Sequence, residues 1–379
     1  MPELTIDLSA IHANVKLCRA LLRPETQLCL LLKCDAYGHG FSAVAESLAG
    51  RMPDYVAIET NAEAQLLCSL YPSLPILRLY AAGADDTRAA TAWNVEETIV
   101  DAGHAELLSR IARETGRPIR VHVDVDTGMG RLGILYDSAV EAILAIARMP
   151  GLELAGVMTH CPVADDPDDG FTRLQHSRMI ELRKALALAG LRPKLHMAAS
   201  AAIFVSPEYH LDMVRLGLIA YGGYPTPRFR SLVTLTPTMQ WEARIVTLRE
   251  LPAGWSVGYG RTHILERPAR IATLDVGYSH GYLRDFSGKG EVLVHGRRAP
   301  VVGRVSMNLT TIDVSAVPEA RVYDSAVLLG RQGGEEISCD ELAAWGNTIP
   351  NEIMTMTGKQ NARRYAMGRI GPMRPVSPT

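Results

Sequence analysis

The sequence predicts an α/β fold, an N-terminal (β/α)8 TIM-like barrel followed by a mostly β C-terminal domain. Its 379 residues exceed what one hydrophobic core usually serves, which favours two domains. From about Ser9 to Tyr221, short apolar runs alternate with amphipathic stretches, as in repeated strand-helix units. After Pro225, threonine, valine and glycine become frequent and long helical periods vanish. We therefore expect domains at residues 1–225 and 226–379.

The first domain contains eight apolar runs that we interpret as strands. These runs are Gln27–Leu32, Tyr55–Ile58, Ile76–Leu79, Glu97–Val100, Ile119–Val125, Leu154–Thr159, Lys194–Met197 and Met213–Leu216. Helical patterns lie between them at Ala10–Leu22, His104–Glu114, Ala139–Arg148 and Leu174–Ala189. Ser9 and Asp101 stand before two of these helices as expected capping residues. Eight strands favour a closed barrel, although the count also fits an open sheet. The segment Gly222–Arg230, rich in glycine and proline, is the expected linker.

Composition and charge exclude several functional classes. Hydrophobic residues make up 47% and charged residues 21% of the chain, as is usual for globular proteins. A net charge of -2 gives no basic field for nucleic acid, so we expect no such partner. The start has no apolar segment typical of a signal peptide, and the apolar stretch Leu28–Leu32 ends at Lys33, too short for a membrane span. Six irregularly spaced cysteines suggest neither a metal site nor disulfides. We expect a cytoplasmic protein without membrane contact.

Lys33 is the first candidate for chemistry, because it closes the apolar run of a predicted buried strand. Burial of an ammonium favours its neutral, nucleophilic form, which prepares a lysine to bond an aldehyde. Alternatively, the side chain merely extends from the strand end to water. Cys34, beside it, is a second possible nucleophile, although buried packing is the commoner role of a single cysteine on a strand.

Other polar residues follow the ends of the predicted strands. They lie in the segments Val123–Arg131, Met158–His160, His196–Ser200 and Arg215–Gly217. Each segment alone fits a packed core residue or a solvated loop. Because the carboxyl ends of barrel strands form one face, their joint placement predicts a catalytic site there that includes Lys33.

The string K-C-D-A-Y-G-H-G at residues 33–40 is similar to the signature of alanine racemases. Four further strings resemble motifs of the same family in the same order. They are D-T-G-M-G-R-L-G at 126–133, H-M-A-A-S at 196–200, R-L-G-L-I-A-Y-G at 215–222 and V-G-Y-G-R-T at 257–262. The resemblance spans nearly the whole chain and implies racemisation of L-alanine to D-alanine with pyridoxal 5'-phosphate (PLP).

The resemblance implies that Lys33 binds PLP covalently. The phosphate would be held by Tyr37, Ser200 and the backbone at Gly217 and Leu218. Arg215 would face the pyridine nitrogen, with His160 beside the ring and His196 orienting Arg215. A guanidinium stays protonated and so leaves the ring nitrogen without a proton, which limits side reactions such as transamination.

Racemisation requires an acid–base group on each face of the α-carbon, and the resemblance implies that Tyr259 is the second one. In the family this tyrosine enters the partner's active site, which implies a homodimer. Nearby positive charge would favour its tyrosinate form. A buried structural tyrosine is the alternative. Arg131 resembles the arginine that holds the carboxylate of a small amino-acid substrate, Met307 a pocket residue from the partner, and Tyr278 an entrance residue.

Several positions depart from the family pattern. Asp124 stands where many members have a lysine, carbamylated in some, and would supply the same negative charge directly beside Arg131. Lys359 falls where many have a phosphate-binding tyrosine, and lysine would bind phosphate instead. The remaining departures are Ala199, Ala202, Ser279–His280 and Asn308–Leu309, in place of asparagine, glycine, Ala-Asp and Asp-Gln. The entrance changes remove acidic charge and leave the substrate preference open.

Three other functions compete with alanine racemisation. A racemase for another amino acid, such as serine, is favoured by the altered entrance. A PLP-binding carrier would keep Lys33 and Ser200 but would not need Tyr259. A decarboxylase of similar layout would need a reactive cysteine in the C-terminal domain, and the surroundings of Cys339 do not resemble that motif.

Overall fold

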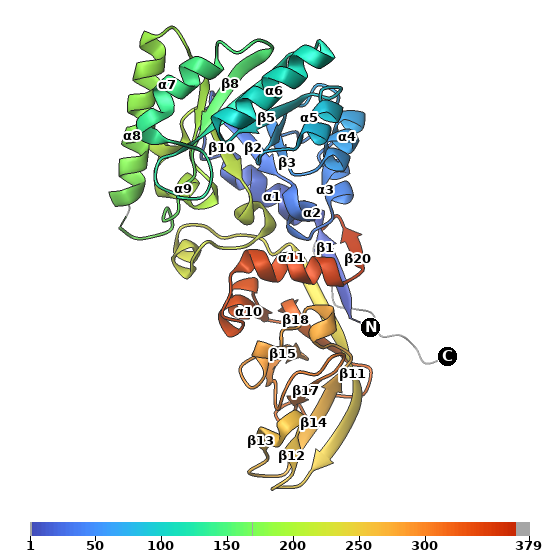
Figure 1. Ribbon diagram of the computed structural model, residues 1–379. Helices are drawn as coiled ribbons and strands as arrows, with labels where there is room; N and C mark the ends of the chain where they lie inside the picture. The colour runs from blue at the N-terminus through green and yellow to red at the C-terminus, as the bar shows by residue number, and fades with distance from the viewer. Residues whose placement is uncertain (1, 169, 369–379) are drawn as a thin grey trace. The chain divides into compact units, whose positions relative to one another are not determined.

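The structure is a computed structural model that describes residues 2–168 and 170–368 (Figure 1). The chain divides into two compact units. We call residues 15–36 and 41–217 the barrel unit. The described residues of 1–14, 37–40 and 218–379 form the second unit, which we call the β unit.

The barrel unit contains a ring of parallel strands. In ring order they are β10 (Met213–Leu216), β2 (Gln27–Leu31), β3 (Tyr55–Ile58), β4 (Ile76–Arg78), β5 (Val95–Ile99), β6 (Ile119–Asp126), β8 (Leu152–Met158) and β9 (Lys194–His196), with the short β7 (Ile134–Leu135) on β6. Backbone hydrogen bonds from Arg215 N to Ala198 O (2.9 Å) and from Asp212 N to Leu195 O (3.0 Å) join β10 to β9. The predicted barrel is thereby confirmed, and the open sheet is excluded.

Helices cover the outside of this ring (Figure 1). They are α3 (Phe41–Ser47), α4 (Asn61–Leu70), α5 (Ala84–Ala90), α6 (Ala102–Thr115), α7 (Tyr136–Ile146), α8 (Gly170–Leu188) and α9 (Ser200–Val205). Between α6–α8 and strands β5–β9 lies a core of aliphatic side chains that includes Leu108, Ile143 and Val123. Asp101 caps α6 as predicted, because its carboxylate accepts from His104 N at 2.7 Å. No helix in residues 2–168 and 170–368 has the length and apolar character needed to cross a bilayer.

The start of helix α1 (Leu8–Arg19) differs from the prediction. Asp7, not Ser9, is its cap, since Asp7 Oδ1 accepts from Ser9 N at 2.9 Å and from Ala10 N at 3.2 Å. A carboxylate one residue before the helix reaches these amides, whereas Ser9 already lies inside the first turn.

The β unit is built on a mixed sheet. Its strands run in the order β16 (Arg297–Pro300), β15 (Glu291–Val294), β18 (Ser325–Gln332), β11 (Met239–Leu251), β1 (Glu3–Asp7) and β20 (Arg363–Ala366), with β14 (Ala269–Leu274), β17 (Thr310–Asp313) and β19 (Glu335–Ile337) attached. Strand β1 pairs antiparallel with β11 and parallel with β20, so the first strand of the chain belongs to this sheet. Two helices, α10 (Cys339–Trp345) and α11 (Pro350–Gln360), accompany it. The mostly β character is confirmed, and the boundary between residues 225 and 226 stays a prediction.

Candidate functional site

Lys33 lies directly after β2, where the backbone turns into an unusual left-handed coil. The four residues Cys34–Tyr37 have φ values of 55°, 57°, 52° and 54°, although none is glycine. Each such L-residue costs roughly 1–2 kcal/mol, and strain of this kind gathers at functional sites. Asp35 Oδ1 accepts from Phe41 N at 2.7 Å and braces the coil. The coil ends the strand abruptly and leaves the Lys33 side chain half-buried.

Arg215, in β10, is the centre of the polar cluster in the barrel unit. Its side chain is only 4% exposed. It donates to His196 Nδ1 at 2.8 Å, and to the carbonyl oxygens of His196 (3.1 Å), Thr159 (2.6 Å) and Met197 (3.2 Å). His160 Nδ1 lies 3.4 Å from Nη2. A cation buried among so many acceptors is held in one position.

His160 shows that several positive charges converge at the carboxyl end of the barrel strands. Burial lowers the pKa of His160 to about 3, assisted by the charges of Arg215, Arg131 and Lys33. The imidazole is therefore neutral at neutral pH and adds no further positive charge. Lys33, Arg131 and Arg215 thus lie close enough to one uncharged ring for their charges to act on it.

The loop before Arg131 is shaped by Asp126, a residue that the sequence reasoning did not single out for a role. Its carboxylate accepts from the amides of Gly128 (2.8 Å), Met129 (2.7 Å) and Gly130 (2.9 Å). Burial opposes ionisation of Asp126, but these three bonds outweigh it and lower its pKa. Gly128 and Gly130 have φ of 135° and 67°, which explains the two glycines of the motif. Asp126 therefore folds the loop that presents Arg131.

Gln175 of α8 ties this loop to His160 and was also missed by sequence reasoning. Its amide donates to Thr127 Oγ1 at 2.9 Å and to His160 O at 3.0 Å. Thr127 and Thr159 hydroxyls lie 2.7 Å apart. A lone glutamine on an amphipathic helix carries no motif, so only the fold reveals this link.

Asp124 lies near the end of β6, and burial raises its pKa to about 6 against the opposing charges of Arg215 and Arg131. Within the described part of the chain, no direct ion pair joins Asp124 to Arg131. The positive charge of Arg131 therefore acts on Asp124 through space rather than through an ion pair.

The expected phosphate residues are divided between the two units. In the barrel unit, Ser200 begins α9 and its hydroxyl accepts from Gly217 N at 3.2 Å. In the β unit, the ring of Tyr37 stacks on that of Tyr221 at 4.8 Å, and Leu218 opens the short helix η2 (Leu218–Tyr221). A hydroxyl and a backbone amide side by side are donors of the kind that phosphate requires.

Lys359 lies at the end of α11, which packs on the turn after Tyr37. A Cβ added at Gly358 would lie 1.8 Å from Gly38 O, and Arg363 donates to the same oxygen at 3.0 Å. Gly358 therefore permits a close approach that any side chain would prevent. This contact brings the backbone of residue 359 close to the Tyr37–Gly38 segment.

Tyr259, Tyr278 and Met307 lie in the β unit and are 68%, 42% and 57% exposed. Tyr278 N donates to Ser306 O at 3.0 Å, so the Tyr278 turn packs on the Met307 loop. The turn that carries Tyr259 approaches the same loop, because a Cβ on Gly258 would lie 3.0 Å from Arg304 N. Three exposed apolar or aromatic side chains thus project from adjoining turns.

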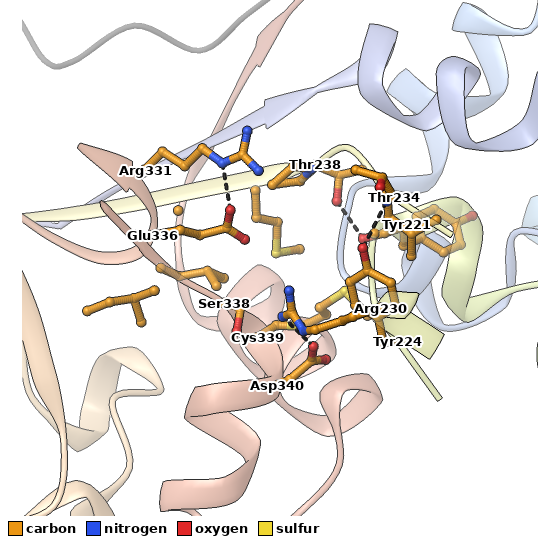
Figure 2. Close-up of a pocket in the computed structure, with 18 residues that line it drawn as sticks. Tyr221, Tyr224, Arg230, Thr234, Thr238, Arg331, Glu336, Ser338, Cys339 and Asp340 are labelled. Atoms are coloured by element: carbon orange, nitrogen blue, oxygen red, sulfur yellow. Dashed lines mark hydrogen bonds and ion pairs between the residues drawn. The ribbon is translucent and has the colours of Figure 1, made fainter. Parts of the chain in front are cut away.

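A separate cavity of about 260 Å³ in the β unit is lined by none of the predicted site residues (Figure 2). Its polar walls are paired within themselves. Arg230 bonds Asp340 at 2.6 Å, and Arg331 bonds Glu336 at 2.6 Å. Tyr224 OH accepts from Leu235 N at 2.9 Å. We interpret these contacts as structural.

The cysteines are free thiols, and neither of those considered as reactive is activated. Cys34 is exposed, and partial desolvation together with Glu59 raises its pKa. Burial also raises the pKa of Cys339. Thiolate chemistry is therefore disfavoured at both positions.

Comparisons with known proteins agree with the observed fold. Residues 6–225 match the family described as alanine racemase, N-terminal domain, and residues 238–365 match alanine racemase, C-terminal domain. The chain belongs to the alanine racemase family. It is 37% identical to alanine racemase of Syntrophobacter fumaroxidans, covering 96% of this chain and 97% of the relative, and 38% identical to that of Desulfosudis oleivorans, covering 97% of each.

Solved structures of alanine racemases have the same fold. The alanine racemase of Streptomyces lavendulae matches with a TM-score of 0.89 and 30% identity over 97% of both chains. The region that matches the N-terminal domain of alanine racemase contains Lys33 and Arg215. The region that matches the C-terminal domain contains Tyr259. Each matched region thus carries one part of the candidate site.

Proposed function

We propose that this enzyme interconverts L-alanine and D-alanine with PLP, using Lys33 and Tyr259 on opposite faces of the substrate. The names of its relatives support the reaction. The observation that carries the proposal is the convergence of Lys33, Arg131 and Arg215 around a neutral His160 at the carboxyl end of the barrel. An amine, two guanidinium groups and a neutral imidazole at one place suit an anionic cofactor that carries an aldehyde.

The residues at the barrel end fit PLP. Lys33 supplies an amine for its aldehyde, and the Ser200 hydroxyl, which accepts from Gly217 N, would donate its own hydrogen to the phosphate. Arg215 supplies a donor that keeps its charge, so a ring nitrogen facing it would remain an acceptor. When bound, the cofactor withdraws electron density from the substrate α-carbon and acidifies its hydrogen.

The chain's own residues then account for removal of the α-proton on one face and its return on the other. Lys33 Nζ takes or returns the α-proton on one face, and the Tyr259 hydroxyl serves the other face. Arg131 holds the substrate carboxylate with its planar donors, so the α-carbon stays between the two groups. Neutral His160 accepts from Arg215 and keeps that cation in place.

Tyr259 is proposed to act in the barrel of a second copy of the chain, which makes the enzyme a homodimer with shared active sites. Its side chain and that of Met307 are more than half exposed, as expected for groups that a partner covers. Arg261 and Arg304 flank the Tyr259 turn and place positive charge beside it. Tyr278 would lie at the entrance.

Serine is the second candidate substrate, favoured by the neutral entrance. Ser279 Oγ donates to Met307 O at 2.8 Å, and the next residue in each case, His280 and Asn308, stands where an acidic residue is usual. Reduced negative charge leaves more freedom for a hydroxyl-bearing side chain. Comparing kcat/KM for the two amino acids decides between them.

The test is to incubate the purified protein with PLP and L-alanine in heavy water. Exchange of the α-proton together with formation of D-alanine is the expected result. A protein that shows the visible absorbance of bound PLP but neither exchange nor inversion would instead be a carrier or act on another amino acid.

A further inference from the structure

Four buried polar side chains form a continuous line inside the barrel, and only its first two members belong to the site described above. Arg215 Nη1 lies 2.8 Å from His196 Nδ1, and His196 Nε2 lies 2.8 Å from His122 Nδ1. His122 Nε2 lies 2.6 Å from a carboxylate oxygen of Glu96. All four side chains are buried.

The direction of each hydrogen bond follows from Arg215. A guanidinium only donates, so His196 Nδ1 must be bare and its proton must lie on Nε2. That proton points to His122 Nδ1, which must therefore accept. The His122 proton then lies on Nε2 and is donated to Glu96. One tautomer of each imidazole satisfies the whole line.

A glycine makes the line possible. In ring order, β8 lies between β6 and β9, so His122 must reach past β8 to meet His196. Gly156 on β8 is the register partner of His122. A Cβ at Gly156 would lie 2.2 Å from His122 Nδ1. The absent side chain is the space through which the two imidazoles touch.

Charged groups around the line favour an anionic end and two neutral rings. Burial alone would raise the pKa of Glu96, but the hydrogen bond from His122 and the charges of Arg120 and Lys194 outweigh it and lower this pKa. Arg120 pairs with the other oxygen of Glu96 at 2.9 Å. Tyr55 OH lies 3.4 Å from that oxygen and accepts from Lys194 at 2.7 Å.

The imidazoles lose their charged forms to burial. Burial lowers the pKa of His122 despite Glu96, and Lys194 and Arg120 lower it further. Burial, Arg215 and Lys194 lower the pKa of His196 well below its usual value. Both rings are therefore neutral at neutral pH, and the carboxylate fixes their protons.

We propose that Glu96 is a positioning residue, which acts through His122 and His196 to hold the Arg215 guanidinium at the proposed cofactor ring. The role of Arg215 at the cofactor ring rests on the proposed function. A carboxylate at the far end polarises both imidazoles, so the bare Nδ1 of His196 becomes a stronger acceptor. Without Glu96, His196 can place its proton on Nδ1, where it faces a donor and displaces the guanidinium.

The first experiment reads the tautomers directly. Protein with 15N-labelled histidine is recorded by NMR with and without PLP, with substitutions of His122 and His196 giving the assignments. We expect bare Nδ1 and protonated Nε2 in both residues, unchanged between about pH 6 and 9. A charged imidazole or a proton on Nδ1 in either residue overturns the proposal. No substrate is involved, so this result does not depend on racemisation.

The second experiment uses variants of the line. Glu96→Leu is expected to mix the tautomers and to lower kcat by about 10- to 100-fold with little change in KM. Glu96→Gln keeps an acceptor for His122 and should restore the tautomers and most of kcat. Gly156→Ala should separate the imidazoles while keeping both. This variant and Glu96→Leu should both shift the visible absorbance of bound PLP.

Glu97→Gln is the matched control, because Glu97 is buried on the same strand and pairs with Arg78 at 3.0 Å outside the line. In this variant the tautomers of His122 and His196 and the absorbance of bound PLP should remain those of the wild type. An effect of Glu97→Gln as large as that of Glu96→Leu would reduce Glu96 to a structural role. Intact tautomers in a protein that racemises nothing would refute the proposed function and leave the line standing.

Discussion

The barrel unit and the β unit present their candidate residues in opposite environments. Arg215 and His196 are buried and hydrogen-bonded within the barrel unit, whereas Tyr259 and Met307 project from turns of the β unit into solvent. Buried polar groups must find partners locally, but exposed aromatic groups gain little until something covers them. The barrel unit is thus preorganised for a ligand, and the β unit offers exposed side chains that the proposed partner would cover.

The largest effect is expected from the barrel side of this comparison. Lys33→Ala removes the amine proposed to bond PLP and to move one proton, so racemisation should fall by more than about 10³-fold. The visible absorbance of bound PLP should disappear as well. Lys184→Ala, at an exposed position of α8, is the control and should change neither property. An unchanged spectrum in Lys33→Ala would remove Lys33 from the site.

The next effect separates the two units. Tyr259→Phe should retain PLP absorbance but slow racemisation by about 10²- to 10⁴-fold, because one face loses its acid–base group. Initial α-proton exchange should suffer more for one enantiomer than for the other. Tyr323→Phe is matched in exposure at 67% and should behave as the wild type. Equal loss for both enantiomers would argue against a dedicated second base.

A smaller effect is expected from the loop that presents Arg131. Asp126→Ala leaves three backbone amides without their carboxylate acceptor, which loosens the loop. Steady-state kinetics should show KM for alanine raised by about 10-fold or more, with a smaller change in kcat. An unchanged KM would show that the loop holds its shape without Asp126.

The smallest effect concerns stability against pH. The pKa of Asp124 is raised in the folded state from 3.8 to about 6, so its contribution to stability is full below 3.8 and is lost as pH rises through about 6. Relative to Asp124→Asn, the wild type should therefore lose about 2 kcal/mol of unfolding free energy between pH 4 and 7. Urea unfolding across this range measures the difference in unfolding free energy between the two proteins. A difference that does not change with pH would show that Asp124 is exposed to water.

The sequence predicted the barrel well, because its strands are apolar runs bounded by polar strand ends. The strands at Tyr55–Ile58 and Met213–Leu216 coincide with their predictions. The pairing of distant segments could not be predicted. The sequence of β1 resembles that of any short strand, and only the fold shows that it pairs with β11 and β20. The left-handed coil after Lys33 could not be predicted, because none of its four residues is glycine.

The candidate site was predictable where motifs mark it and hidden where geometry makes it. Gly156 in a strand suggests only local weakness, and Glu96 and His122 resemble alternating strand residues. Their role depends on three strands meeting in one register, which a single sequence does not reveal. Asp126 stood in a quoted motif, yet its three amide bonds are a property of the folded loop.

The most direct test of a site shared between two copies is to mix the Lys33→Ala and Tyr259→Phe variants. Each is expected to be nearly inactive alone. If Tyr259 serves the partner's Lys33, a mixed dimer contains one intact site, and random exchange of subunits should restore about a quarter of wild-type activity. If mixed dimers form, as shown by differently tagged subunits, and activity does not return, the shared site is contradicted.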